Sequence, residues 1–148
     1  MKKCRRSHDQ EIATLVFRVD PKLLANAVER VWAEPLGKNQ YRVRNVPFLV
    51  SGVSLYDVVK AIRINGELRA FTVLRRGGHS TFRLLLERPM AESHPTFARF
   101  WRPLKRLGCG YERGRDRFIV IDVPHCLDIP EVVRHSKEAN RRGAGDIV

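Results

Sequence analysis

Several common signals of function are absent from this chain. Its three cysteines, Cys4, Cys109 and Cys126, form no CxxC pair, and their odd number argues against a disulfide framework. No apolar run is long enough to cross a membrane. The basic start, residues 1–10, is not followed by the apolar segment of a signal peptide. We therefore expect a soluble cytoplasmic protein with no membrane partner.

The spacings that mark catalytic, phosphate-binding and metal-binding sites are also missing. The stretch GGHST lacks the lysine of a phosphate-binding loop, and the chain has no nucleophile elbow. The scattered His94, His125 and His135 give no pair of metal ligands on one element. We expect no metal and no cofactor. His125 and Cys126 are expected to end a strand, with Cys126 buried as a small hydrophobic residue.

Acidic residues are few: 16 Asp and Glu stand against 28 Lys and Arg, which gives a formal net charge of +12. This excess favours an anionic partner, such as nucleic acid, an acidic protein surface or lipid headgroups. An arginine content set by a GC-rich genome is an equal alternative, and the charge then serves only solubility. The 148 residues, 43% of them hydrophobic, fit one domain or two small lobes with a sizeable interior.

What the chain does contain is organised around residues 41–60, YRVRNVPFLVSGVSLYDVVK. The strand formers of this stretch are Tyr41, Val43, Val46, Phe48 and Val50. Pro47 removes a backbone donor, so this strand is an edge or is broken at residues 45–47. Asp57 has two interpretations. In the favoured one it closes a turn by accepting backbone N–H groups; in the other it points into a cleft as a base or a cation anchor.

Strand and turn signals predict a β-rich lobe over residues 11–77. Ile12–Val19 is typical of a first strand. Asn65-Gly66 predicts a hairpin between Val58–Ile64 and Leu68–Leu74, and Gly37-Lys38-Asn39 predicts another. Apolar residues at helical spacing after Pro21 predict a helix within residues 21–31. Short strands joined by such turns favour a small barrel or a strongly curled sheet.

The pattern changes after the hinge-like pair Gly77-Gly78, over residues 78–138. The predicted elements are a strand at Thr81–Glu87, an amphipathic helix at Pro95–Leu107, strands at Tyr111–Glu112 and Phe118–Val123, and a helix from Pro130. This order is typical of a ferredoxin-like α/β lobe. The predicted class is therefore α+β, with a curled β-lobe followed by a ferredoxin-like lobe. Residues 1–10 are expected to form a flexible arm and residues 139–148 a frayed tail.

Ordered blocks of the sequence resemble a known family. They are WAEPLG (32–37), YRVRNVPF (41–48), GVSLYDVV (52–59), GHSTFRLLL (78–86), LGC (107–109) and IDVP (121–124). They are similar to the bacterial domain-of-unknown-function family 4265, over about residues 16–133. The family pattern maps onto Trp32, Asn45, Pro47, Phe48, Asp57, His79, Ser80, Thr81 and Arg83.

This resemblance implies no activity, because the family is named for the lack of one. It does imply that Glu29–Pro35 is extended, which limits the predicted helix to Pro21–Ala27. The chain departs from the family pattern at Tyr56, where the pattern implies glycine, and at its GAGDIV ending.

The best candidate for a ligand site is the stretch that begins at the two glycines. Its expected ligand-binding or anion-binding residues are Gly78, His79, Ser80, Thr81 and Arg83. His79 can move protons, and Asp57 beside it would act as an orienting carboxylate, so these two are the catalytic candidates. The alternative, which base rates favour, is a turn followed by a hydroxyl-rich strand start.

A basic surface is the other candidate site. It consists of Arg99, Arg102, Lys105, Arg106, Arg113, Arg115 and Arg117. It suits a phosphate backbone or an acidic protein, although a solvated helix face is the favoured alternative. The aromatic residues of this helix fall on its core side, so they form no stacking platform for bases.

These observations lead to three hypotheses. The first is a non-enzymatic cytoplasmic binding protein that engages an acidic protein partner, as a bacterial regulator or toxin-neutralising protein does. The second is a nucleic-acid-binding protein that uses the Arg99–Arg117 surface. The third is a small enzyme that uses Asp57 and His79.

Overall fold

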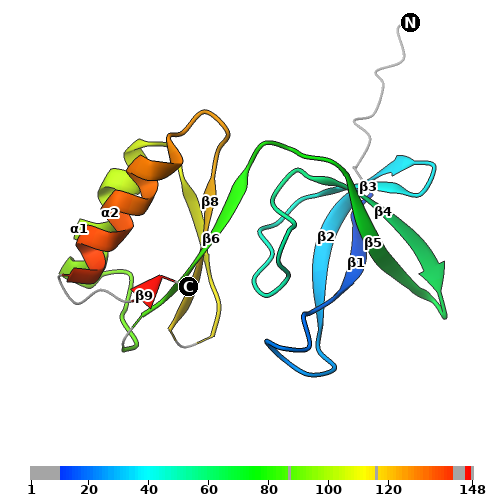
Figure 1. Ribbon diagram of the computed structural model, residues 1–148, viewed down its shortest axis with the longest axis horizontal. Helices are drawn as coiled ribbons and strands as arrows, with labels where there is room; N and C mark the ends of the chain where they lie inside the picture. The colour runs from blue at the N-terminus through cyan, green and yellow to red at the C-terminus, as the bar shows by residue number, and fades with distance from the viewer. Residues whose placement is uncertain (1–10, 87, 116, 142–145, 148) are drawn as a thin grey trace, which may run out of the picture.

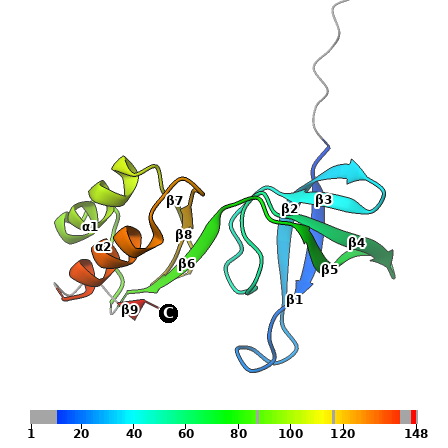
Figure 2. The ribbon, with the colours of Figure 1, turned by 45° about the horizontal axis from the view of Figure 1, so that its top comes forward.

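A β-barrel lobe and an α/β lobe lie side by side in the structure (Figures 1 and 2). The structure is a computed structural model that describes residues 11–86, 88–115, 117–141 and 146–147. The expected basic arm, residues 1–10, lies outside the described residues. No helix within these ranges is long and apolar enough to cross a membrane. The predicted α+β class and the curled N-terminal sheet are confirmed.

Five strands close the barrel in the order β1-β2-β3-β4-β5. They are β1 (Ala13–Arg18), β2 (Val28–Gly37), β3 (Gln40–Val43), β4 (Val58–Ile64) and β5 (Glu67–Arg75). Each strand is antiparallel to the next, and since their number is odd, β5 meets β1 in parallel. Alternate side chains, among them Leu15, Val31 and Ala61, point inward and fill the barrel.

Left-handed backbone conformations form both predicted hairpin turns. Asn65 and Gly66, with φ of 49° and 82°, join β4 to β5. Gly37, Lys38 and Asn39 all have positive φ and join β2 to β3. Both turn predictions are confirmed.

Residues 21–27 form turns, so the predicted helix at Pro21–Ala27 is wrong. The side chains of Leu23 and Leu24 are 58% and 52% exposed, so these residues do not pack on a core as an amphipathic helix would. The chain reverses here instead, because Val28 pairs with Arg18 across the β1–β2 ladder. The extended conformation that the resemblance implies for Glu29–Pro35 is correct, since these residues lie within β2.

The strand predicted from Tyr41 ends at Val43, and the break expected around Pro47 is confirmed. Val46, Phe48 and Val50 lie in the connection between β3 and β4. Val46 and Val50 are nevertheless buried. These apolar residues therefore pack a loop against the rest of the protein, and they do not form a strand.

The second lobe has the β-α-β-β-α-β order of a ferredoxin-like unit. Its elements are β6 (Ser80–Leu85), α1 (Pro95–Arg106), β7 (Gly110–Arg113), β8 (Phe118–Val123), α2 (Ile129–Arg141) and β9 (Asp146–Ile147). The antiparallel sheet has the order β7-β8-β6-β9. Within the expected frayed tail, residues 139–141 complete α2, and β9 pairs with the free edge of β6.

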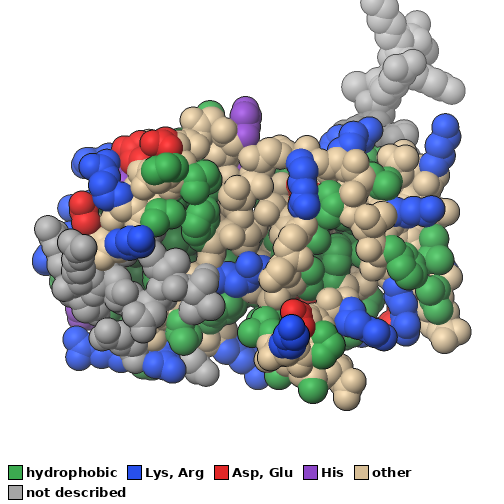
Figure 3. Space-filling model, viewed as in Figure 1, with side chains coloured by type: hydrophobic (Ala, Val, Ile, Leu, Met, Phe, Trp, Pro, Cys, Tyr) green, Lys and Arg blue, Asp and Glu red, His purple; other side chains and the backbone are tan. Residues whose placement is uncertain are grey.

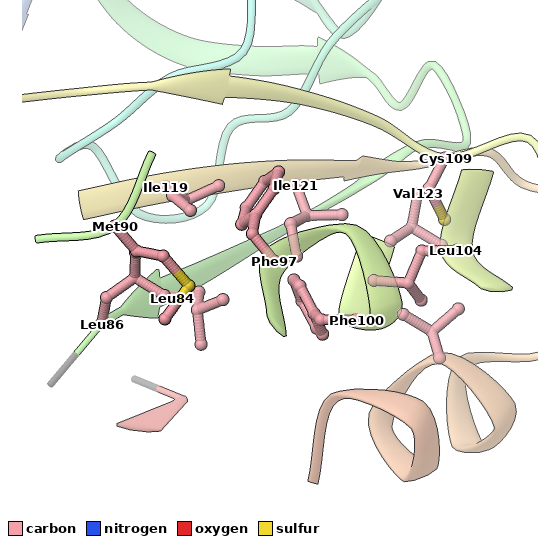
Figure 4. Packing of buried hydrophobic residues seen from close by; sticks show 11 residues of the cluster. Leu84, Leu86, Met90, Phe97, Phe100, Leu104, Cys109, Ile119, Ile121 and Val123 are labelled. Atoms are coloured by element: carbon pink, nitrogen blue, oxygen red, sulfur yellow. The ribbon is translucent and has the colours of Figure 1, made fainter. Parts of the chain in front are cut away.

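Both helices cover one face of this sheet, and the barrel lies toward the other face (Figures 1 and 2). The apolar side chains between sheet and helices form the core of the lobe (Figure 4). As predicted, Phe97, Phe100 and Leu104 are the buried face of α1. They pack with Ile119 and Ile121 of β8.

Gly77 and Gly78 carry the chain from the barrel into β6 through a narrow space. A Cβ atom added to Gly77 would lie 2.5 Å from the carbonyl carbon of Tyr56. Gly78 has φ of +87°, and an added Cβ atom would lie 2.9 Å from Cβ of His125. The two glycines therefore allow the link to pass close to the rest of the chain.

We predict that Gly77→Ala destabilises the protein by roughly 1–3 kcal/mol, because the added methyl group overlaps backbone atoms that cannot rotate away. Gly110→Ala is the matched control, since its added Cβ atom meets only Asp122, at 4.0 Å. We expect the control to change stability by less than about 1 kcal/mol. Urea unfolding followed by circular dichroism measures both variants, and equal midpoints would contradict the prediction.

Candidate functional site

The sequence candidates Asp57 and His79 both lie where the two lobes meet. Residues 44–57 connect β3 to β4 and rest on the sheet face opposite the helices. Along β6, Thr81 and Arg83 reach this connection: Thr81 Oγ1 lies 3.0 Å from Ser54 Oγ, and Arg83 donates to backbone carbonyl groups. The candidate site is therefore an internal surface between the lobes.

Asp57 is a buried carboxylate that connects its own loop with the start of the link between the lobes. Its side chain is 0% exposed. It accepts hydrogen bonds from Gly77 N at 2.7 Å, from Ser54 N at 3.0 Å and from Arg76 Nη1 at 3.0 Å. The bond to Ser54 closes the turn that the sequence favours, and the other two fix the start of the link. These three donors use both carboxylate oxygens.

His79 pairs with Asp122 of β8, and not with Asp57. Its Nδ1 lies 2.9 Å from each oxygen of that carboxylate. The Tyr56 and His79 rings are nearly perpendicular, with centroids 4.9 Å apart. The two paired side chains are only 14% and 10% exposed. A proton on Nδ1 donated to Asp122 leaves Nε2 as an acceptor, which is how a carboxylate orients a histidine that moves protons.

Sequence reasoning missed Asp122, although a signal for it exists. Asp122 is the one charged residue in the run FIVIDV, whose side chains are otherwise apolar. A charge in such a run requires a partner. That partner is His79. Thr81 of β6 pairs with Asp122 of β8, and His79 lies two residues before Thr81.

Arg83 and Glu29 hold residues 47–50 from opposite sides. Arg83 donates from Nε to Phe48 O at 2.5 Å and from Nη2 to Val50 O at 2.6 Å. Glu29 accepts from the backbone N–H groups of Phe48, Leu49 and Val50 at 2.6, 2.8 and 2.9 Å. Burial lowers the pKa of the Arg83 guanidinium, and the charge of Glu29 acts in the opposite direction.

The candidate ligand residues are thus largely occupied within the chain. Arg83 binds carbonyl groups, Thr81 contacts Ser54, and Gly78 approaches His125. Ser80 begins β6 opposite Val123. The arrangement joins the lobes through contacts within the chain.

The residues of the predicted basic surface separate into two groups. Arg99, Arg102, Lys105, Arg106 and Arg115 are exposed. Arg113 is partly buried: it donates to Met90 O, and its guanidinium lies 5.3 Å from the centre of the Phe97 ring. Arg117 is also partly buried and has interactions within the chain. The exposed basic surface is therefore mainly the outer face of α1.

Cys126 is exposed, so the expectation that it is buried is wrong; it lies in the turn after β8, beyond the core. Cys109 is the buried cysteine. Burial raises the pKa of the Cys109 thiol to about 11, and the nearby Asp122 adds to this effect. Within the described ranges, no group of three or more His, Cys, Asp or Glu side chains is arranged to hold a metal ion.

A family model matches most of the chain, residues 29–146, and is described as "Domain of unknown function (DUF4265)". The chain belongs to this family. A hypothetical protein from Neisseria gonorrhoeae has a similar crystal structure, with a TM-score of 0.75 and 11% sequence identity. The match covers 96% of this chain and 94% of that one, and at this identity it shows the fold alone. No curated protein shows significant similarity to the chain.

One residue at the lobe interface has an unusual backbone conformation. Tyr56 has φ of +66°, a conformation that glycine adopts freely and that an aromatic residue rarely adopts. This is the position where the resemblance led us to expect glycine in place of tyrosine. In this chain the Tyr56 ring contacts His79 and lies 5.7 Å from the guanidinium carbon of Arg44.

We predict that Asp57→Asn destabilises the protein by about 2–4 kcal/mol. The asparagine side chain has no negative charge to pair with Arg76, and its NH₂ group would point at a hydrogen-bond donor where a carboxylate oxygen now accepts. Asp20→Asn is the matched control. Asp20 is exposed and also accepts a local backbone bond, from Lys22 N at 2.9 Å. Chemical unfolding should show a loss several times larger for Asp57→Asn, and similar losses for both would contradict the role of Asp57.

We also predict that the two described cysteines differ strongly in reactivity. At pH 8 only roughly one Cys109 thiol in a thousand would be ionised, given its pKa of about 11. Iodoacetamide should therefore alkylate Cys126 first in a Cys4→Ser background, and Cys109 only above about pH 10 or after unfolding. Peptide mass spectrometry measures both sites, and equal native rates at pH 8 would contradict the burial of Cys109.

Proposed function

We propose that this protein is a non-enzymatic cytoplasmic binding protein that engages an acidic protein partner through the outer face of α1. One observation carries the proposal. Arg99, Arg102, Lys105 and Arg106 are exposed, and none of them forms an ion pair with any residue in the described ranges. Four unpaired cations on one helix create a positive surface that attracts a negatively charged one.

The packing of α1 directs these cations outward. Because Phe97, Phe100 and Leu104 are buried against the sheet, the helix has only one face left for its charges. Some arginines of the barrel are paired instead: Arg30 and Arg69 share Glu67, and Arg42 pairs with Glu34. Charge complementarity of this kind chiefly favours rapid and specific association.

Nucleic acid is the second candidate partner, and the formal net charge of +12 favours it. Lys and Arg side chains are spread over both lobes on the face shown in Figure 3. However, the aromatic residues of α1 offer no surface for stacking bases. Phe97 and Phe100 are buried, and Trp101 packs edge-on against Tyr111 with centroids 4.5 Å apart. A contact with nucleic acid would therefore rest on phosphates alone.

The enzymatic alternative receives less support. The carboxylate of Asp57 is fully buried and bonded, and the pair of His79 with Asp122 lies between the lobes. Three cavities lined by described residues lie on the barrel, and His79 lines none of these three. We therefore assign these residues to the joining of the lobes.

We predict that Arg102→Ala with Arg106→Ala weakens partner binding by roughly tenfold or more, because interface arginines commonly contribute over 1 kcal/mol each. Lys38→Ala with Lys60→Ala removes the same charge from exposed barrel positions and should leave binding nearly unchanged. The measurement is affinity capture from a bacterial lysate at low and high salt, followed by quantification of the captured protein. Equal losses in both double variants would contradict the proposal.

The salt series separates the two partners. A stoichiometric protein with a conserved acidic surface that remains bound at high salt supports the proposal. Capture of nucleic acid alone, with release as salt rises, overturns it in favour of phosphate binding.

A further inference from the structure

The barrel is incompletely paired at its seam. β1 pairs with β5 only through Leu15↔Leu68 and Val16↔Arg69. β5 continues to Arg75 and stays paired with β4 on its other edge. From Ala70 onward, the edge of β5 that faces β1 has no neighbouring strand among the described residues. These six residues present about 20 Å of strand edge, which is enough to pair with another short strand.

A groove runs beside this open edge. Two hollows of about 570 and 460 Å³ lie along the seam, and Arg18, Ala70 and Phe71 line both of them. The groove forms because β1 turns away after Arg18, where Val19 N bonds to Ala27 O at 3.0 Å. Its far side is the loop of residues 50–53. An extended peptide fits such a space better than a helix does, since the groove follows a strand.

Phe71 offers an apolar contact at this edge. Its side chain is 59% exposed, although it stands on a strand in the middle of a hairpin. Leu74, farther along β5, is 44% exposed. Large apolar side chains next to an unpaired edge are usually covered or replaced by charged ones, because they promote pairing with other chains. Their presence here supports a strand that adds to β5.

The charges around the groove favour an acidic occupant. Arg18 lines the groove and Arg75 ends the open edge; both are exposed, and neither forms an ion pair within the described ranges. Arg76 also lines the groove, with its side chain 64% exposed although it contacts Asp57. The acidic residue Glu67 is neutralised by Arg30 and Arg69.

We propose that the open edge of β5, from Ala70 to Arg75, binds an extended acidic segment of a protein partner as an added strand. Backbone bonds to β5 supply the register, apolar residues of the segment cover Phe71, and its carboxylates face the unpaired Arg18 and Arg75. This inference rests on the proposed function in that the partner is an acidic protein. The β5 edge lies in the barrel and the α1 surface in the other lobe, so an experiment can disprove one contact without disproving the other.

The test selects ligands from a displayed library of random twelve-residue peptides, using the full-length protein. We expect enrichment of peptides in which acidic residues alternate with apolar ones. Arg18→Ala with Phe71→Ala should weaken the best peptide at least tenfold, whereas Lys60→Ala with Ile62→Ala, a matched pair on the outer surface of β4, should not. Arg102→Ala with Arg106→Ala should also leave peptide affinity unchanged, which distinguishes this site from the α1 surface.

Hydrogen exchange then locates the added strand. Bound peptide should slow exchange of alternate amides within residues 70–75, and the same peptide N-methylated on the amides that pair should lose this effect. The proposal would be overturned if no peptides were enriched, or if the best peptide bound the Arg18→Ala, Phe71→Ala variant as tightly as the unchanged protein. Protection from exchange confined to α1 would also overturn it. A dimer that the seam variants convert to monomer would overturn it as well, because the occupant would be a second copy of this chain.

Discussion

The carboxylate of Asp57 fixes the relation between the two lobes. It is completely buried, and it binds one donor from its own loop and two from the link, Gly77 N and Arg76. A buried carboxylate is strongly destabilising unless such donors surround it, so only the conformations that supply them all are populated. The link therefore leaves the barrel in one direction, and β6 begins in one place.

The other polar residues at the interface follow from this placement. Once β6 lies across the 44–57 connection, the backbone of residues 47–50 is removed from water and needs partners. Glu29 supplies acceptors from the barrel, and Arg83 supplies donors from the second lobe. His79 and Asp122 complete the interface within the second lobe. The candidate residues of the sequence thus make contacts that join the two sheets, and Tyr56 takes its unusual backbone conformation beside them.

The predictable parts of this fold depend on neighbouring residues. The Asn65-Gly66 turn, the apolar face of α1 and the break at Pro47 are set by chemistry within a few positions, and each was readable from sequence. The partners of His79 and Arg83 lie 43 and up to 36 positions away, and strand order decides them. The turns at 21–27 show the same limit, because the register of β1 with β2 overrides helical spacing. For this reason the sequence singles out these polar residues but cannot show what they contact.

The internal use of these polar groups determines where binding can occur. Asp57, Glu29, Arg83 and Asp122 are already bonded within the chain, so an external partner must contact side chains and backbone that the fold leaves unpaired. Among the described residues, the cations of α1 and the edge of β5 are two such places, which we propose as the contacts, and they lie in separate lobes (Figure 1). Because the interface holds the lobes together through buried bonds, the separation of these two surfaces is set before binding. A partner with one acidic surface and one extended segment at that spacing would gain affinity from both contacts without a further loss of conformational entropy in the lobes.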